Sequence, residues 1–171
     1  MSARHAGRVS DRDPENWQWR DGRVEPGSAV VFDMDGVLSD ASTRQHYLDR
    51  PFRDWEAFFE ACGEDELISE VARLLDVLDP DLRVVLLTAR PGRVRPQTVG
   101  WLKRYDLRWD LLVMRDWDDH GSSRGYKQRT VHELRDFGFD LRIAFEDDRR
   151  NVDMFHAEGV PCVYIHSGYY D

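Results

Sequence analysis

The stretch that most constrains the fold runs from Ala29 to Leu38, where an apolar run ends in two aspartates and a glycine. The run from Ala29 to Phe32 predicts a buried strand, because a strand covered on both faces does not alternate polar and apolar residues. Asp33 and Asp35 would share one side of that strand if it continued, and Gly36 permits a sharp turn. Ligands bind at the carboxyl ends of strands in open α/β sheets, so we expect a site here.

Strand and helix patterns alternate along the rest of the chain. Further apolar runs predict strands over 83–87, 110–114, 141–145 and 160–165, and helical spacing or capping signals predict helices over 54–59, 67–78, 96–105, 127–137 and 151–158. Alternation of this kind is typical of a parallel sheet with right-handed crossovers. The sequence therefore predicts a three-layer, Rossmann-like α/β fold with a parallel five-stranded sheet and helices on both faces.

Residues 1–28 differ from the rest because they are polar and rich in Pro and Gly. We expect an N-terminal arm without a core element, disordered in its first part, followed by a single domain over 29–171. Trp17 and Trp19 are the exception in this arm. We expect these large aromatic side chains to dock on the domain, the alternative being a platform for stacking bases.

The composition limits the classes of partner and the compartment. The 171-residue chain is 41% hydrophobic and carries a net charge of −9, which argues against a broad surface for duplex nucleic acid but allows one phosphorylated end. No apolar run approaches the ~20 residues of a membrane span or follows the basic N-terminus as in a secretory signal. We predict a soluble cytoplasmic protein in which Cys62 and Cys162 are buried reduced thiols.

Four polar signals follow successive predicted strands, and the parallel topology brings them to one crevice. They are Asp33 with Asp35, Thr88, Lys127, and Asp147 with Asp148. Taken singly, Thr88 is typical of a helix cap, Lys127 of a solvated helix residue, and the acidic pair of a helix N-terminus. Their convergence is what indicates a functional site.

This set of side chains suits phosphoryl transfer. Carboxylates without clustered His or Cys form a hard oxygen site that favours Mg²⁺. A hydroxyl at Thr88 and an ammonium at Lys127 can contact phosphate oxygens. One carboxylate can act as a nucleophile and form an aspartyl-phosphate, while a second exchanges protons with the leaving oxygen and water. Asp33 and Asp35 fit these two roles.

The order of these motifs resembles the haloacid dehalogenase (HAD) superfamily of phosphotransferases. The resemblance implies that Asp33 is the nucleophile and Asp35 the general acid and base, with Thr88 and Lys127 binding the phosphoryl group. It also implies a Mg²⁺ site made by Asp33, the backbone carbonyl of Asp35, and the pair Asp147 and Asp148. Many members carry an acid where this chain has Asn151, and Glu146 is a less favoured ligand.

A closer likeness is to the phosphatase domain of phage-type polynucleotide kinases. It is carried by Thr88-Ala89-Arg90-Pro91, by Phe145 to Arg149, by Ser167-Gly168, and by Asp54-Trp55 through Phe59. The likeness implies that Arg90 helps to bind the phosphate. The sequence lacks the phosphate-binding loop of kinases, so any kinase activity would need a separate partner chain.

The intervals between motifs leave no room for an independent lid, so we expect no separate cap domain and an open site. The predicted activity is Mg²⁺-dependent hydrolysis of phosphomonoesters, on nucleic acid 3′-phosphate ends or nucleotides. The alternatives are a phosphatase of small metabolites such as sugar phosphates, or a non-catalytic phospho-accepting or binding domain. We expect core packing by Trp55, Phe58 and Phe59, the alternative being that part of this cluster borders the site. We expect solvent exposure of Arg44, His46, Arg115 and His120, the alternative being that these loop residues rim the crevice.

Overall fold

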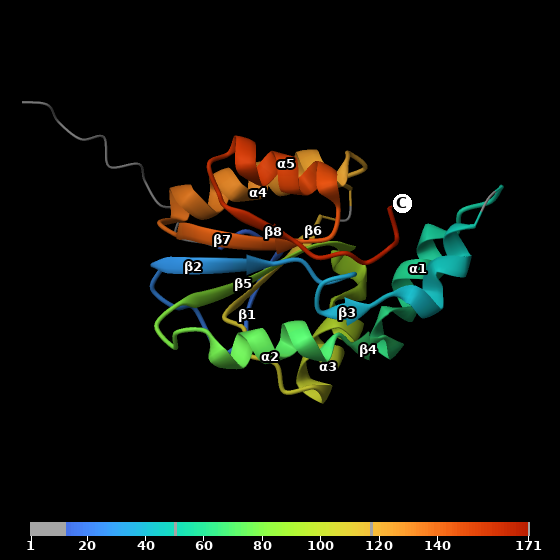
Figure 1. Ribbon diagram of the computed structural model, residues 1–171, viewed down its shortest axis with the longest axis horizontal. Coiled ribbons are helices and arrows are strands. Elements are labelled where there is room, and N and C mark those ends of the chain that lie inside the picture. Colours follow the sequence, from blue (N-terminus) through green and yellow to red (C-terminus); the bar gives the residue numbers. More distant parts are fainter. Residues whose placement is uncertain (1–12, 50, 117, 171) are drawn as a thin grey trace, which may run out of the picture.

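A computed structural model of the chain describes residues 13–49, 51–116 and 118–170, and its centre is a six-stranded sheet (Figure 1). Five of the strands are parallel, and the first is antiparallel to its neighbour. In spatial order they are β1 (Trp17–Trp19), β6 (Leu111–Arg115), β5 (Arg83–Pro91), β2 (Ser28–Phe32), β7 (Asp140–Glu146) and β8 (Cys162–Tyr164). The strand that precedes Asp33 therefore lies inside the sheet, between β5 and β7.

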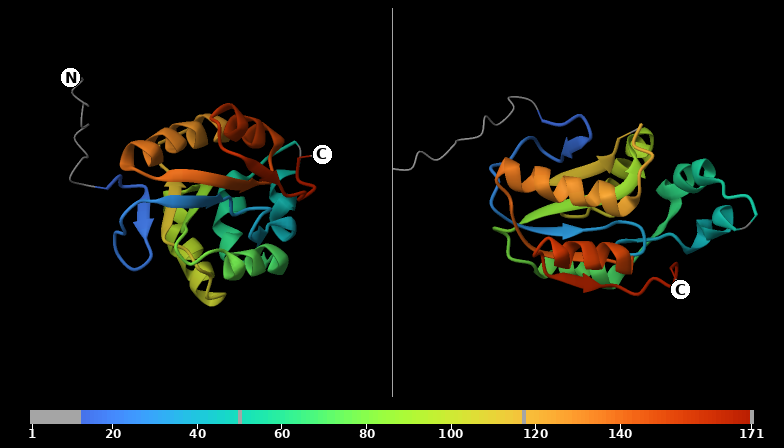
Figure 2. Two further views of the ribbon diagram at one scale, coloured as in Figure 1. Left: turned by 60° about the vertical axis from the view of Figure 1, so that its left-hand side comes forward. Right: turned by 90° about the horizontal axis from the view of Figure 1, so that it is seen from above.

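Helices cover both faces of this sheet. One face carries α2 (Ser69–Val77) and α3 (Arg95–Arg104), and the other carries α4 (Ser123–Phe137) and α5 (Arg149–Ala157), as Figure 2 shows from two further sides. Alternate residues of β2 enter opposite cores, with Phe32 packing on the α2/α3 side and Val31 on the α4/α5 side. The predicted three-layer α/β fold is confirmed.

Strand β1, which lies in the N-terminal arm, corrects two expectations. β1 pairs with β6, and the Trp17 side chain is buried with its ring 5.0 Å from that of Phe137. The docking of both tryptophans is thus confirmed, whereas the absence of a core element before residue 29 and the count of five strands were wrong. Alternating aromatic side chains in Trp-Gln-Trp form a short edge strand even within a polar arm. The expected disorder concerns residues 1–12, which lie outside the described residues.

The segment between β2 and α2 forms a small insert, defined here as residues 39–67. It contains β3 (Ser39–Asp40), η1 (Ser42–Leu48), α1 (Trp55–Glu60), η2 (Ala61–Glu64) and β4 (Glu66–Leu67). The insert is fastened to α3, because Trp101 Nε1 donates to the carbonyl of Asp65 at 2.8 Å and Gln97 donates to Glu60 at 2.9 Å. The insert is therefore held against the side of the sheet that α3 covers.

Local signals for helix ends agree with the structure. The Asp54 side chain accepts a hydrogen bond from the Ala57 amide at 2.9 Å at the start of α1, and Pro96 lies in the first turn of α3. Gly138 ends α4 with φ of +115°, a conformation that other residues rarely adopt. Cys62 is buried and Cys162 partly buried, and both are free thiols. Within the described ranges, no helix has both the length and the apolar character to cross a bilayer.

Candidate active site

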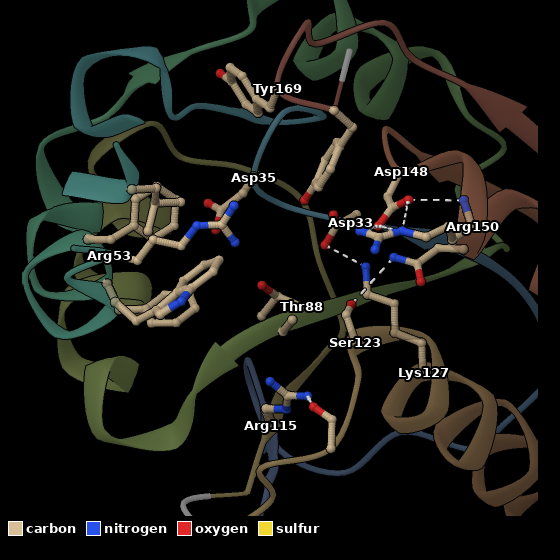
Figure 3. A pocket seen from close by; sticks show the side chains of 18 of the residues that line it. Asp33, Asp35, Arg53, Thr88, Arg115, Ser123, Lys127, Asp148, Arg150 and Tyr169 are labelled. Carbon is tan, nitrogen blue, oxygen red and sulfur yellow. Dashed lines mark hydrogen bonds and ion pairs between the residues drawn. The ribbon is translucent and has the colours of Figure 1, made fainter. Parts of the chain in front are cut away.

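A cavity of about 910 Å³ opens at the carboxyl ends of the central strands (Figure 3). Five of the side chains predicted to meet there line it, namely Asp33, Asp35, Thr88, Lys127 and Asp148, whereas Asp147 and Arg90 are buried and do not. They come from β5, α4 and the segments that follow β2 and β7. The topology therefore gathers residues that are up to 115 positions apart (148 − 33) around one space.

One side of the site is built around Lys127. We call this side the lysine half, and it consists of four residues, Asp33, Lys127, Glu146 and Asp147. Lys127 Nζ lies 2.9 Å from Asp33 Oδ1 and 2.7 Å from Glu146 Oε2. Glu146 Oε1 accepts hydrogen bonds from the backbone amides of Asp147 at 3.0 Å and Asp148 at 3.1 Å. Glu146, which sequence reasoning ranked below its neighbours, therefore holds both the lysine and the turn that carries the acidic pair.

The lysine half has three buried carboxylates and one ammonium group. Burial, together with the neighbouring charge of Glu146, raises the pKa of Asp33 well above its ordinary value. Burial likewise raises the pKa of Asp147 to about 8. The pKa of Lys127 is also raised, because the attraction of Asp33 and Glu146 outweighs its burial. This half therefore carries more negative charge than its own residues can neutralise.

The lysine half fits a divalent cation. Oxygen atoms of Asp33, Glu146 and Asp147 lie within 4.8 Å of one another. Both carboxylate oxygens of Asp147 are buried without a hydrogen-bond partner among the described residues, an arrangement that costs free energy unless a cation completes it. All these donors are hard oxygens, which suit Mg²⁺. Both oxygens of Glu146 already have partners, so Asp33 and Asp147 are the better placed ligands.

Gly36 makes room for the acidic pair. Its φ is +81°, and a Cβ atom at this position would lie only 2.0 Å from Asp147 Oδ2. Asp148 is placed differently from its neighbour, because its carboxylate caps α5 by accepting from the Arg150 amide at 2.9 Å and also pairs with the Arg150 guanidinium at 2.8 Å. Asp148 thus stands at the cavity wall, outside the group of three close carboxylates.

The other side of the site is built around two arginines, and we call its residues Asp35, Ser39, Arg44, Asp65 and Arg90 the arginine half. The terminal nitrogens of Arg44 and Arg90 both lie 2.5 Å from Asp35 Oδ1. Asp65 receives Arg44 Nε at 2.8 Å, Arg44 Nη2 at 2.7 Å and Arg90 Nη2 at 3.3 Å, and it also accepts from the Ser39 hydroxyl. Two carboxylates therefore face two guanidinium groups.

This balance of charge sets the protonation state of Asp35. Burial would raise its pKa, but the guanidinium groups of Arg90 and Arg44 outweigh burial and lower the pKa to about 2. Arg44 was expected to be exposed, and this expectation was wrong because the side chain is buried and packs over Phe58 with its guanidinium carbon 4.2 Å from the ring centre. Sequence reasoning also missed Asp65.

The other residues named in the sequence analysis differ in their burial and in whether they line the cavity. Arg90 is completely buried behind Asp35 and is not among the residues that line the cavity, whereas Thr88 lines it and accepts a hydrogen bond from the Arg90 amide at 3.2 Å. Arg115 is half-buried rather than exposed, and both Arg115 and the exposed His120 line the cavity. His46 is exposed as expected.

The aromatic residues of α1 form a wall of the same cavity. Phe58 is buried and Phe59 half-buried, but Trp55 keeps 48% of its surface exposed. Phe58 therefore has the core position expected from sequence, and all three side chains line the cavity, which agrees with the alternative that the cluster borders the site. The insert therefore contributes to the site although it is fastened to α3.

A comparison with protein families identifies the chain. The family "Polynucleotide kinase PNKP phosphatase domain" matches residues 27–170. The chain belongs to this family. Among curated proteins, no match was found.

Solved structures agree with the family. A chain in "Structure of the Pnkp1/Rnl/Hen1 RNA repair complex" has 25% identity and a TM-score of 0.71, over 91% of this PNKP-type phosphatase domain and 47% of that chain. The class C acid phosphatase from Bacillus anthracis with tungstate bound, at 15% identity and a TM-score of 0.62 over 88% of this chain and 70% of that one, shares the fold. The present chain spans about half the length of the Pnkp1 chain that it matches.

Proposed function

We propose that this PNKP-type domain hydrolyses phosphomonoesters at nucleic acid 3′ ends or on nucleotides, through an aspartyl-phosphate on Asp33 and with Mg²⁺. The observation that carries the proposal is the lysine half, where a carboxylate at the cavity is held by Lys127 beside the unpartnered carboxylate of Asp147. This arrangement supports Asp33 as the nucleophile, Lys127 as the cation for the phosphate oxygens, and Asp147 as a ligand of the metal ion.

In the first step, an oxygen of Asp33 attacks the phosphorus atom, an O–P bond forms, and the ester P–O bond breaks. Asp35 gives a proton to the leaving oxygen. Its pKa of about 2 keeps Asp35 ionised in the free site, so this role requires that the bound phosphoryl dianion raise that pKa by repulsion and that Asp35 take up a proton from water before the ester bond breaks. The effect of substrate charge on Asp35 is therefore part of the proposal.

In the second step, water attacks the phosphorus of the aspartyl-phosphate while Asp35 takes up a proton. The bond to Asp33 breaks, inorganic phosphate forms, and the carboxylate of Asp33 is regenerated. Thr88 and Lys127 contact the phosphoryl oxygens in both steps. Glu146 keeps the Lys127 ammonium in place through their 2.7 Å contact. Arg90, expected from sequence at the phosphate, acts instead by positioning Asp35.

Asp33, Asp147 and the backbone carbonyl of Asp35 would hold Mg²⁺, which when bound neutralises negative charge on the transferring phosphoryl group. Asp148 would contribute charge at the cavity wall and keep Arg150 in place. The buried oxygens that lack partners support this assignment. A separate kinase partner chain and a cytoplasmic location remain predictions.

The test is hydrolysis of a chromogenic phosphate ester and a 3′-phosphorylated oligonucleotide by the purified chain. We expect turnover with Mg²⁺, none after chelation, and none in Asp33→Asn. The matched control is Asp153→Asn on the exposed face of α5, which should keep full activity. Turnover that survives chelation or Asp33→Asn would refute the mechanism.

A substrate panel separates the remaining alternatives. Sugar phosphates that are hydrolysed as efficiently as oligonucleotide 3′ ends would favour a phosphatase of small metabolites. An absence of turnover with every ester, in protein that still binds Mg²⁺, would favour a non-catalytic phospho-accepting or binding domain.

A further inference from the structure

The cavity extends well beyond the residues that perform the chemistry. Its lining includes Arg53, Trp55 and Phe59 of the insert, which no step of the proposed mechanism uses. A volume of about 910 Å³ is within the range of sites that hold a whole small molecule and is much more than a phosphoryl group needs. Something attached to the phosphate can therefore occupy the space beside the insert.

The aromatic wall begins directly beside the reacting groups. The Arg44 guanidinium touches Asp35 at 2.5 Å and lies over the Phe58 ring at 4.2 Å. The ring centre of Trp55 follows 5.7 Å from that of Phe58. Two side chains, Arg44 and Phe58, thus connect the proposed acid and base to Trp55, and Asp35 and Trp55 line the same cavity.

Trp55 has the features of a stacking platform. Phe59 supports its ring from one side in a stacked arrangement, with centres 5.9 Å apart and an angle of 28° between planes. The indole is nonetheless 48% exposed although it lines the cavity. A supported and exposed ring is suited to receive a flat aromatic ligand, and stacking on a base is worth ~1–3 kcal/mol.

Arg53 supplies a positive charge beside this platform. It points from the insert into the cavity (Figure 3), and it has no ion pair or hydrogen bond with the described residues. The other two arginines that line the cavity already have partners, since Arg115 donates to the carbonyl of Gly121 and Arg150 pairs with Asp148. Arg53 is exposed at the cavity, so its guanidinium is available to bind an anionic group of the substrate.

We propose that Trp55 stacks on the base of the nucleotide that carries the 3′-phosphate, and that Arg53 binds the phosphodiester preceding that nucleotide. The inference rests on the proposed phosphatase activity and identifies residues that select its substrate. The substrate is a nucleic acid 3′ end whose terminal base has one face free to stack on the indole. A sugar phosphate offers neither the base nor a second phosphate.

The test compares two substrates in each variant. One is glycerol 2-phosphate, a small ester without an aromatic ring, and the other is a single-stranded oligonucleotide with a 3′-phosphate. Trp55→Ala should lower kcat/KM for the oligonucleotide about tenfold, mainly through KM, and leave the hydrolysis of glycerol 2-phosphate unchanged. Trp55→Phe should recover most of the loss. Phe52→Ala is the matched control, because Phe52 is 87% exposed on the same segment but does not line the cavity.

An oligonucleotide whose last nucleotide lacks a base provides a sharper measurement. The unmodified enzyme should lose about tenfold on this abasic end, and Trp55→Ala should lose nothing further, because the stacking partner is already absent. An equal effect of Trp55→Ala on the abasic and intact ends would overturn the stacking assignment. So would an equal loss on the oligonucleotide and on glycerol 2-phosphate.

Arg53 is tested by salt. If it binds a phosphodiester, Arg53→Ala should flatten the dependence of log kcat/KM on log salt concentration by about 0.7 for the oligonucleotide. Arg142→Ala should leave the slope unchanged, because Arg142 is at an exposed position of β7, where it pairs with Asp140. An unchanged slope in Arg53→Ala would overturn this part. An absence of turnover in the unmodified protein would instead contradict the proposed phosphatase activity itself.

Discussion

The two halves of the site contain the same kinds of buried group in different proportions. In the arginine half, the carboxylates of Asp35 and Asp65 face two guanidinium groups, and the pKa of Asp35 falls to about 2. In the lysine half, three carboxylates face Lys127 alone, and the pKa of Asp147 rises to about 8. One half is complete within the protein, and the other needs a further cation.

The difference in charge balance gives the two halves different properties. The arginine half favours a fixed arrangement of its side chains, and the lysine half favours the binding of a cation. A balanced buried network holds its members in fixed positions, because removing one charge leaves another unpaired. An unbalanced one is costly by itself and becomes favourable when a metal ion binds. Substitutions that remove one charge should therefore have different consequences in the two halves.

The largest effect is expected for Lys127→Met. This change removes the ammonium that contacts Asp33 and Glu146, leaving three buried carboxylates without an internal cation. We expect a loss of kcat by about a thousandfold and a decrease in the free energy of unfolding by about 3–5 kcal/mol. Steady-state kinetics and urea denaturation measure the two effects. Gln128→Met, at an exposed position of α4, serves as the control. A Lys127→Met protein of ordinary activity would contradict the assignment of Lys127 to the phosphoryl group.

The next effect is expected for Asp65→Asn in the arginine half. The substitution leaves Arg44 and Arg90 with only one carboxylate between them, so the free energy of unfolding should fall by about 3 kcal/mol. Urea denaturation without Mg²⁺ provides the measurement. Glu66→Gln, one residue further on at an exposed position, should change stability little. A neutral Asp65→Asn would show that the arginine half is not a balanced network.

Asp147→Asn should act in the opposite direction. Near neutral pH the unfolded chain gains free energy by ionising Asp147, whereas the folded metal-free protein keeps this carboxyl protonated, so the substitution should raise the stability of the metal-free protein by about 1 kcal/mol or more. The same protein should lose the increase in Tm that Mg²⁺ gives to the unmodified chain. Differential scanning calorimetry with and without Mg²⁺ tests both points. If the metal-free variant lost stability and kept its Mg²⁺ response, the two halves would not differ as described.

The smallest effect concerns pH. The raised pKa of Asp147 means that, between pH of about 4 and 8, the folded metal-free protein holds a proton that the unfolded chain has released. The stabilisation from this group is therefore complete below pH of about 4 and is lost as pH rises through about 8. Mg²⁺ replaces the proton, so its Tm increment should be larger near pH ~8.5 than near pH ~6. Calorimetry should show no such trend in Asp147→Asn.

The sequence was sufficient to predict the residues that follow strands. Asp33, Thr88 and Lys127 were placed at one sheet edge because parallel topology fixes where strand ends meet, and the structure brings all three to one cavity. The predicted helices and the five parallel strands follow from the same hydrophobic patterns. Whether these residues perform the proposed roles stays a prediction.

The sequence could not predict the buried charge pairs. Arg44 lies in a polar segment and Asp65 in an acidic one, where both are typical of solvent-exposed positions. Their burial depends on a match between side chains 21 positions apart (65 − 44), which no local pattern reports. Glu146 was set aside because its neighbours match the metal motif, although it is the residue that holds Lys127. Arg90 was expected at the phosphate but lies behind Asp35.

The short edge strand β1 has a practical consequence for recombinant work. An expression clone trimmed to residues 27–170, the span that the family comparison matches, would delete Trp17–Trp19. The edge of β6 would then present unpaired backbone amides and carbonyls, and Phe137 would lose the ring that covers it. We expect the protein expressed from such a clone to aggregate. A protein that begins at or before Asp13 retains β1, which covers the edge of β6.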